Sequence, residues 1–329
     1  MIKDSIDAVI TWVDGNDPQH KKKLAACIGQ LNIQTESAHP TRFNEVGEFE
    51  FCIASLLRFA PWLRKIFIVT DNQFPGFWNQ IQKSRFAEKI ELVSHEIIFN
   101  GYEDVLPTFN CRSIFTLLWR IPGLSEQYIY LDDDFILLNP VSPKDFFNES
   151  KIILRGKWEL QQKYRLLERF PFFMNSGIKP LERAGNRRGQ AFAAEKAGYK
   201  RKYFRAPHTP HPQLVSLQEE FYKNNPEEIS KNIKYKFRSE QQYVPTALTT
   251  HIALKKNKAE VVASNSTMRL KMDKISTLRL KLSLWFADKK LKKFLFGCFQ
   301  SLDLASHKNK KILIDWLTNR IGSLSKVLE

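Results

Sequence analysis

The sequence lacks the two glycine-rich patterns by which many proteins hold nucleotides. Neither GxGxxG nor GxxxxGK[ST] occurs in it, so neither the dinucleotide fingerprint nor a P-loop is present. Only four cysteines are present, and no two of them have the spacing of a zinc knuckle or a redox pair. A zinc site and a disulfide framework are therefore not indicated, and any bound nucleotide has to be held by other means.

Long apolar runs are also missing. No stretch approaches the length of a transmembrane helix, and charged residues interrupt the first seven positions, where a signal peptide needs its apolar segment. We therefore expect a cytoplasmic location. The chain also has no internal repeat and no low-complexity tract.

Acidic residues are outnumbered by basic ones. The 329 residues include 51 Lys and Arg against 35 Asp and Glu, which gives a formal net charge of +16. A charge of this size favours an anionic partner, namely nucleic acid, a membrane surface or phosphorylated substrates, without choosing among them. The hydrophobic fraction of 43% is enough for a normal core.

Short apolar runs and helical patterns alternate through the first half of the chain. This alternation predicts an α/β fold with a mostly parallel sheet and helices on both faces. The expected strands are 6–13, 65–72, 90–93 and 127–131, and the expected helices are 19–31, 49–59, 77–86 and 111–120.

Three consecutive aspartates, Asp132, Asp133 and Asp134, stand between two apolar runs, which indicates strand, acidic turn, strand. Their mutual repulsion favours a bound hard cation, Mg²⁺ or Mn²⁺, which suits carboxylate oxygens. The alternative is a solvated acidic turn. Asp14 ends the first strand, where ligands bind in α/β folds, whereas Asp17 followed by Pro18 is typical of a helix cap.

A second unusual stretch is Ala206–Pro212, in which three prolines flank His208 and His211. Proline keeps this segment out of a helix, and a rigidly held imidazole suits a general base. An ordinary proline-rich loop is the alternative.

The pattern changes after residue 142, where basic residues become frequent and the periodicity is hard to follow. We divide the chain into a nucleotide-sugar-binding half (1–142), an insertion with the His and Arg segment that completes the same domain (143–268), and a C-terminal helical region (269–329). The insertion and the C-terminal region are expected to be basic and largely helical. Expected later elements are helices 213–223, 241–255 and 305–321 and a strand at 260–263. Residues 269–296 are consistent either with a basic amphipathic helix on an anionic membrane or with a packed surface helix whose lysines reach solvent.

Together these motifs resemble the Stealth family of sugar-1-phosphate transferases of bacterial capsule and surface-polysaccharide synthesis, which includes the animal lysosomal-enzyme N-acetylglucosamine-1-phosphotransferase. The matching blocks are 6–18, a long second block from Arg42 through the acidic turn, a third from 208 to 240, and a weak fourth at 296–298. The chain departs from the family pattern at Asp132 (usually Asn), Ala54 (usually Arg) and Gln300-Ser301 (usually Asn-Asp).

The resemblance implies a GT-A-like Rossmann core, a UDP-sugar donor and a polysaccharide or oligosaccharide acceptor. It places the metal-binding motif on Asp132, Asp133 and Asp134, the active-site histidine on His208 and the active-site arginine on Arg238. We expect Asp133 to act with this His and Arg in catalysis. The expected reaction is transfer of a hexose 1-phosphate with release of UMP. Residues expected to bind donor or substrate are Asp14, Arg42, Asp71, Asn110, Arg120 and His211.

Two other classes of function remain open. One is a metal-dependent glycosyltransferase that releases UDP. The other is a non-enzymatic binder of nucleic acid or of an anionic membrane, although no nucleic-acid module is recognisable and we expect no specific nucleic-acid partner. Peripheral contact with the inner membrane is compatible with the basic composition.

Overall fold

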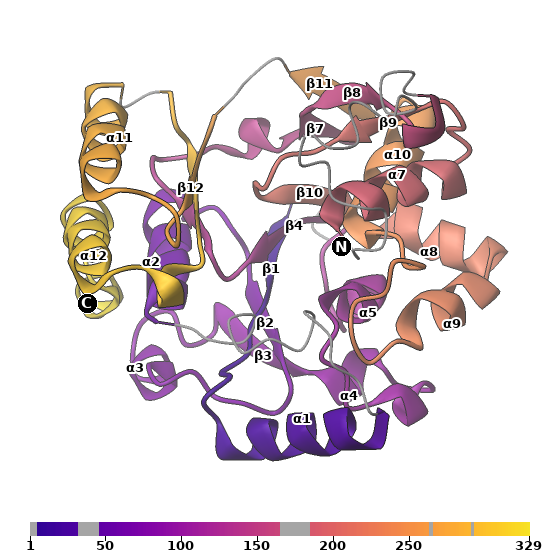
Figure 1. Ribbon diagram of the computed structural model, residues 1–329, viewed down its shortest axis with the longest axis horizontal. Helices are drawn as coiled ribbons and strands as arrows, with labels where there is room; N and C mark the ends of the chain where they lie inside the picture. Colours follow the sequence, from indigo (N-terminus) through magenta and orange to yellow (C-terminus); the bar gives the residue numbers. More distant parts are fainter. Residues whose placement is uncertain (1–4, 32–45, 165–184, 263–265, 291–292) are drawn as a thin grey trace, which may run out of the picture.

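A five-stranded sheet forms the centre of the protein. The computed structural model describes residues 5–31, 46–164, 185–262, 266–290 and 293–329 (Figure 1). The strand order is β10-β4-β1-β2-β3, with β1 to β4 parallel and β10 antiparallel to β4. The predicted α/β class with a mostly parallel sheet is confirmed. The strands are β1 (Ile6–Thr11), β2 (Ile66–Thr70), β3 (Ile90–Ser94), β4 (Gln127–Asp132) and β10 (His211–Leu214).

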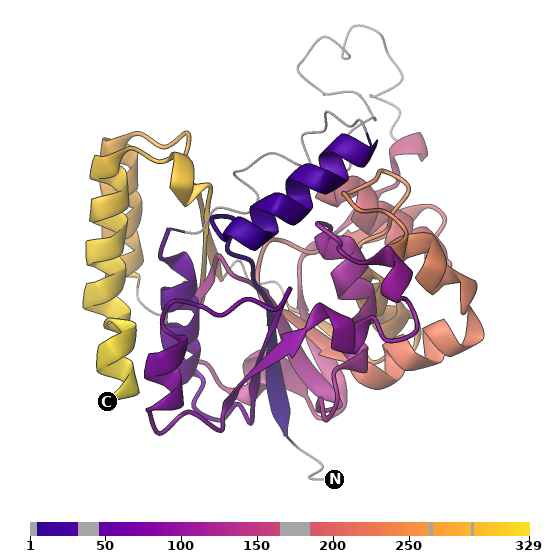
Figure 2. The same ribbon diagram turned by 90° about the horizontal axis from the view of Figure 1, so that it is seen from below.

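The central strands are apolar runs because both faces of the sheet are covered. All of Ile66–Thr70 is buried, as are the first five residues of β1. Helices α2 and α5 lie on opposite sides of the sheet in both views (Figures 1 and 2). The helices of this half are α1 (Pro18–Leu31), α2 (Glu48–Phe59), α3 (Trp78–Gln82), α4 (His95–Ile98) and α5 (Cys111–Leu117).

The predicted cap of α1 is confirmed. The helix begins at Pro18, and the Oδ1 atom of Asp17 accepts a hydrogen bond of 2.7 Å from the backbone N–H of His20. This bond satisfies an amide that the first turn of a helix otherwise leaves without a partner.

Residues 143–268 mix strands with helices. Their strand β10 lies at the edge of the main sheet, where Pro212 removes no ladder bond that a neighbour needs. The predicted helix 241–255 begins only at Pro245. The elements are β6 (Phe147–Asn148), β7 (Lys151–Arg155), β8 (Lys157–Leu160), α7 (Asn186–Lys196), β9 (Lys202–Arg205), α8 (Val215–Asn224), α9 (Glu227–Ile233), α10 (Pro245–Lys255) and β11 (Ala259–Val262).

The single helix considered for residues 269–296 is wrong. The segment instead contributes to two strands and one helix. Residues 267–272 alternate between buried and exposed side chains, which is the pattern of a strand. A new helix begins after Ser276, whose hydroxyl caps it by accepting a 3.3 Å hydrogen bond from the Arg279 N–H. β13 pairs antiparallel with β5 and parallel with β12. The elements are β5 (Phe135–Leu137), β12 (Thr267–Lys271), α11 (Thr277–Lys289), β13 (Phe296–Gln300), α12 (His307–Ile321) and α13 (Leu324–Leu328).

The C-terminal helices form a layer over α2. Helices α12 and α13 pack against α2, and α11 packs against α12 at the outer edge of the molecule (Figure 1). Among the described residues, no helix is both long enough and apolar enough to cross a membrane. Short 3-10 turns complete the fold at Glu103–Val105, Leu118–Arg120, Pro143–Asp145, Gln162–Tyr164 and Leu302–Leu304.

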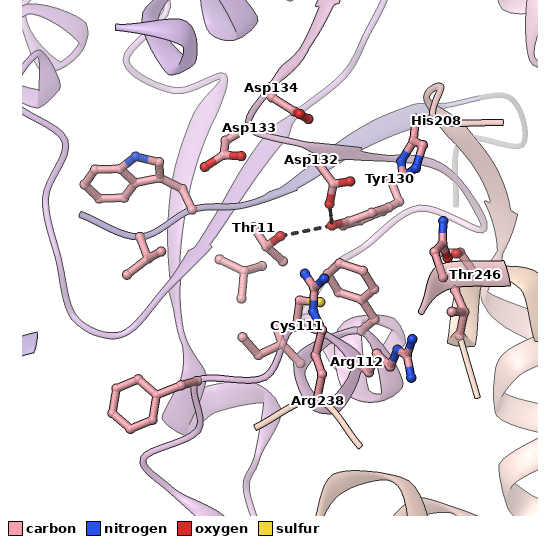
Figure 3. Close-up of a pocket in the computed structure, with 18 of the residues that line it drawn as sticks. Thr11, Cys111, Arg112, Tyr130, Asp132, Asp133, Asp134, His208, Arg238 and Thr246 are labelled. Atoms are coloured by element: carbon pink, nitrogen blue, oxygen red, sulfur yellow. Dashed lines mark hydrogen bonds between the residues drawn. The ribbon is translucent and has the colours of Figure 1, made fainter. Parts of the chain in front are cut away.

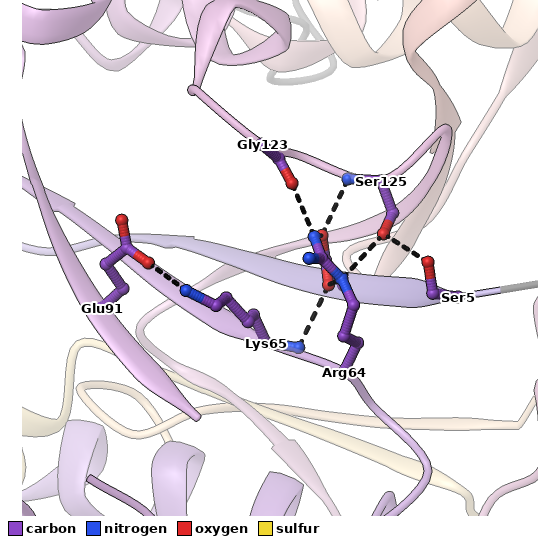
Figure 4. A network of polar contacts seen from close by, with 7 residues as sticks. Ser5, Arg64, Lys65, Glu91, Gly123 and Ser125 are labelled. Atoms are coloured by element: carbon purple, nitrogen blue, oxygen red, sulfur yellow. Dashed lines mark hydrogen bonds and ion pairs between the residues drawn. The ribbon is translucent and has the colours of Figure 1, made fainter. Parts of the chain in front are cut away.

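A polar network ties together the amino ends of the parallel strands (Figure 4). The fully buried Asp7 on β1 accepts hydrogen bonds from the backbone N–H groups of Lys65 (3.0 Å) and Ser125 (2.8 Å), and it pairs with Arg64. Arg64 also donates to the Gly123 carbonyl at 2.6 Å. The network therefore fixes the approach to β2 and β4 at the edge of the sheet opposite the cavity described next.

Candidate active site

A cavity of about 380 Å³ opens at the carboxyl ends of the parallel strands. A lining residue stands at or directly after the carboxyl end of each of the four parallel strands: Thr11 and Asp132 end β1 and β4, and Asp71 and His95 directly follow β2 and β3. The carboxyl edge of an open α/β sheet is where such folds bind ligands. The cavity is therefore the candidate functional site.

The acidic turn lies on one wall of this cavity, where Asp132, Asp133 and Asp134 all contribute to the lining (Figure 3). The Tyr130 hydroxyl donates a 2.5 Å hydrogen bond to Asp132 Oδ1 and lies 3.0 Å from the Thr11 hydroxyl. Burial raises the pKa of Asp132, and the bond from Tyr130 opposes that rise. Burial, together with the negative charges of Asp132 and Glu48, raises the pKa of Asp134 to about 7.

Strand β13 covers the other side of the turn. Cys298 lies opposite Phe135 in the β13–β5 ladder, and its sulfur is 3.7 Å from Asp134 Oδ2. The residues that follow, Gln300 and Ser301, line the cavity. The weak fourth block of the sequence is thus placed directly beside the acidic turn.

The donor set of the turn fits a hard divalent cation only in part. Burial raises the pKa of both Asp132 and Asp134, and the charge of Asp132 adds to the rise at Asp134; a nearby cation stabilises such carboxylates, and their oxygens suit Mg²⁺. Within the described ranges, however, no three Asp, Glu, His or Cys side chains are grouped so as to hold an ion. The arrangement therefore suits Mg²⁺ in its usual mode, with one or two carboxylates and the remaining ligands from phosphate and water.

The two histidines of the proline-rich segment also line the cavity. The segment is held at its start by two hydrogen bonds between the Gln190 amide and the Ala206 backbone, of 2.9 and 3.1 Å. At its end it joins β10, in which His211 pairs with Tyr130 of β4. Burial lowers the pKa of His208 to about 4, and the positive charges of Arg269, Arg205 and Arg238 add to that effect. Burial likewise lowers the pKa of His211 to about 4, so both imidazoles are neutral at pH 7.

Arg238 reaches the cavity from a loop between α9 and α10 (Figure 3). Its neighbours there are the Cys111 sulfur and the Asp132 carboxylate, which raise the pKa of the guanidinium in that order of importance. A charged guanidinium thus stands near the acidic turn.

The loop that carries Arg238 is hydrogen-bonded to Asn110 and Arg112 at the start of α5, and we call this set of hydrogen bonds the strap. The Asn110 amide donates to the carbonyl oxygens of Tyr235 (3.0 Å) and Phe237 (2.9 Å). The Arg112 guanidinium donates to the carbonyls of Ser239 (2.9 Å) and Gln242 (3.2 Å). These bonds bracket position 238 on both sides, so Asn110 and Arg112 set where Arg238 lies.

The structure therefore brings seven predicted residues to one cavity. They are Asp71, Asp132, Asp133, Asp134, His208, His211 and Arg238.

Three other predicted residues are described but do not line the cavity. Asp14 exchanges two 3.0 Å backbone hydrogen bonds with the Gln73 side chain. Asn110 belongs to the strap, and Arg120 donates to the carbonyls of residues 98 and 100. Arg42 lies outside the described residues.

Sequence reasoning missed several lining residues, among them Tyr130, Cys111, Arg112 and Thr246. Tyr130 could have been found, because residues two apart on a strand share a face and its hydroxyl therefore points the same way as Asp132. Cys111, Arg112 and Thr246 carry no local signal, since only the docking of the 235–246 segment on α5 brings them together. His95, which directly follows β3, also lines the cavity.

The geometry defines an α/β protein with an acidic turn, a neutral histidine and an arginine around one ligand cavity. Residues 4–32 match Stealth protein conserved region 1, and residues 42–154 match Stealth protein conserved region 2. The chain thus carries both conserved regions, and the resemblance to the Stealth family is confirmed. The second region includes the acidic turn, whereas His208 and Arg238 lie beyond residue 154.

Similar proteins bear related names. The capsular polysaccharide phosphotransferase WcwK of Streptococcus pneumoniae is 42% identical over 146 residues, which are 44% of this chain and 42% of the relative. The exopolysaccharide phosphotransferase SCO2592 of Streptomyces coelicolor is 43% identical over 144 residues, 43% of this chain and 15% of the relative. The chain thus matches less than half the length of either protein.

Among solved structures, mouse xyloside xylosyltransferase 1 is similar with a TM-score of 0.40 at 11% identity, over 90% of this chain and 97% of that one. The glycosyltransferase GlyE of Streptococcus pneumoniae is similar with a TM-score of 0.41 at 12% identity, over 99% of this chain and 62% of that one.

Proposed function

We propose that this protein transfers a hexose 1-phosphate, in particular an N-acetylhexosamine 1-phosphate, from a UDP-sugar to a hydroxyl of a growing surface polysaccharide. The observation that carries the proposal is the convergence of the acidic turn, His208 and Arg238 on one cavity. The names of the similar proteins support the same class of reaction.

In the proposed reaction the acceptor oxygen forms a bond to the phosphorus that carries the sugar. The bond between that phosphorus and the bridging oxygen of the diphosphate breaks, and UMP leaves with the bridging oxygen. The acceptor hydroxyl loses its proton. The products are UMP and a phosphodiester between two sugars.

His208 is the proposed acceptor of that proton. Its low pKa keeps the imidazole neutral at pH 7, which leaves a nitrogen free to take a proton. Arg238, one of the cations that lower this pKa, lines the cavity, and an anionic donor bound beside it opposes its effect. Donor binding therefore raises the basicity of His208 when the acceptor is in place.

Arg238 is the proposed clamp on the transferred phosphoryl group. A guanidinium offers a planar fork of donors that matches two phosphate oxygens, and it remains charged in every state of the cycle. The strap from Asn110 and Arg112 holds the loop of Arg238 in position before the substrate arrives, which favours reaction by pre-organisation.

Asp133 and Asp134, with Asp132 behind them, are the proposed holders of Mg²⁺ or Mn²⁺. Such an ion supplies charge neutralisation at the diphosphate and the leaving UMP. The Tyr130 hydroxyl holds Asp132 Oδ1 and so orients one carboxylate of the group.

Identification of the released nucleotide tests the proposal. Purified protein is incubated with UDP-N-acetylhexosamines, Mg²⁺ and extracted surface polysaccharide, and the nucleotides are separated. We expect UMP, its loss with EDTA, and its loss in His208→Ala and Asp133→Asn. The exposed His307 provides a matched control, because His307→Ala should leave the rate unchanged. Release of UDP would instead indicate attack at the anomeric carbon by a glycosyltransferase, and normal rates in either active-site variant would contradict the assigned roles.

A further inference from the structure

Helix α11 has two apolar faces, and only one of them is covered. Leu280, Leu284 and Ala287 are buried on the side that packs against α12. On the opposite side, four large apolar residues face solvent. They are Leu278 (70% exposed), Leu282 (49%), Trp285 (52%) and Phe286 (51%).

These four residues form one stripe along the helix. Positions 278, 282, 285 and 286 recur at intervals of three and four, which places their side chains on a common face. The rings of Trp285 and Phe286 are in contact at 5.0 Å between centroids, so the stripe is continuous at its C-terminal end. We call these four residues the apolar stripe.

The rim of the apolar stripe is cationic. Arg279, Lys281 and Lys289 are exposed on α11, and Lys289 Nζ lies 5.9 Å from the centroid of the Trp285 ring. The only acidic residue of α11 is Asp288, and it is turned toward α12, where Arg320 pairs with it at 2.9 Å. The charge offered around the stripe is therefore positive.

We propose that the apolar stripe docks on the surface of an anionic lipid bilayer. Leucine and aromatic side chains that enter the boundary between headgroups and acyl chains, flanked by Lys and Arg that meet anionic headgroups, are the two components of interfacial helix binding. This docking is separate from the proposed transfer reaction, because none of the four stripe residues lines the cavity.

The charge of the rim argues against a second copy as the occupant. A two-fold dimer through this face would bring the same cations against each other, and each copy carries a net charge of +16. Figure 1 places α11 at the edge of the molecule farthest from α8 and α9, so this edge is free to rest on a flat surface.

Cosedimentation with vesicles tests the proposal. The full chain should bind vesicles of phosphatidylcholine with phosphatidylglycerol, bind phosphatidylcholine alone poorly, and release as salt is raised. Leu282→Ser combined with Trp285→Ser should weaken binding by at least about tenfold, because both substitutions remove apolar side chains that would be buried at the bilayer boundary. The matched control is Phe74→Ser with Val261→Ser, which removes exposed apolar residues elsewhere and should leave binding unchanged.

Two double variants distinguish an effect of the cations beside the apolar stripe from an effect of the net charge. Arg279→Gln with Lys281→Gln should weaken binding more than Lys22→Gln with Lys83→Gln, although both lower the net charge equally. Equal losses in the two variants would overturn the assignment to α11.

A conservative variant provides a readout that does not depend on folding of the serine variants. Brominated lipid in the anionic vesicles should quench tryptophan fluorescence of the wild type. Trp285→Phe should still bind but should lose most of that quenching. Unchanged quenching would overturn the proposal. The proposal would also be overturned by two results together. Light scattering would show that the wild type is a dimer that the double serine variant dissociates, and the wild type would not bind vesicles.

Discussion

Replacement of Asp134 by Asn should make the protein more stable and inactive at the same time. In the absence of a cation, burial and the charges of Asp132 and Glu48 raise the pKa of Asp134 from 3.8 to about 7. A carboxyl with a raised pKa stabilises the fold fully below pH 3.8, and this contribution is lost as the pH rises through 7. At pH 8 the wild type therefore holds a carboxylate that its surroundings disfavour, whereas Asn carries no charge.

The size of the effect follows from the shift. About three pKa units at roughly 1.4 kcal/mol each give on the order of 4 kcal/mol at pH 8. This is an upper limit, because Asp134 borders the cavity and is partly solvated there. At roughly 2 °C per kcal/mol for a large chain, Asp134→Asn should melt a few degrees higher than the wild type in EDTA.

The assay is thermal unfolding at pH 8 and at pH 4, with EDTA and with Mg²⁺. In EDTA, the melting temperature of the variant should exceed that of the wild type at pH 8, and the difference should be smaller at pH 4. Mg²⁺ should also reduce the difference at pH 8, because it stabilises only the wild type. Asp273→Asn, at an exposed position, is the control and should change nothing. If Asp134→Asn melts no higher than the wild type at pH 8 in EDTA, the account of the acidic turn is wrong.

Three further predictions concern the strap, the sheet edge and a buried histidine. Arg112→Ala should lower the rate of UMP release by on the order of 10- to 100-fold without loss of the fold, because Arg238 loses its positioning; an unchanged rate with intact circular dichroism would contradict the strap. Asp7→Ala should reduce the free energy of unfolding by about 3 kcal/mol in urea titration, since two buried N–H groups lose their acceptor; a change under about 1 kcal/mol would be inconsistent with the network. Burial lowers the pKa of His251 to about 4, so this residue alone should contribute a loss of stability of about 1.4 kcal/mol per unit as the pH drops from 6.5 to 4, and His251→Gln should reduce the wild-type slope by about that amount in urea titrations; an equal slope would refute it. Protonation of His251 also removes a hydrogen bond. The Phe204 N–H donates to His251 Nε2 at 2.8 Å, and a protonated Nε2 could no longer accept it.

Much of the main sheet could be predicted from the sequence, because its parallel strands are buried on both faces and are therefore short apolar runs. The acidic turn was equally visible, since three adjacent carboxylates are rare at a strand end. Strand β10 was not predicted. Its residues His211–Leu214 contain a proline and lack an apolar run, and only pairing with β4 makes them a strand.

The rest of the site depends on contacts between distant segments. Arg238 could be named from the family resemblance, but the strap that positions it joins residues 110–112 to 235–242, and no local pattern encodes that docking. The helix predicted over 241–255 begins at Pro245 because the Gln242 side chain is taken up in the strap, where its Oε1 accepts from Asn110 at 2.9 Å. For residues 269–296, the alternation of buried and exposed residues and the cap at Ser276 were signals that apolar spacing alone concealed.

The pairing of β5 with β13 has a consequence for how the protein is made. β5 leaves the ribosome well before its partner β13, because the paired residues Leu137 and Phe296 lie 159 positions apart in the sequence. Contacts between residues so distant in sequence form late and slowly. During synthesis the acidic turn therefore remains uncovered on its β13 side, and the nascent chain acquires a complete cavity only after β13 has been translated.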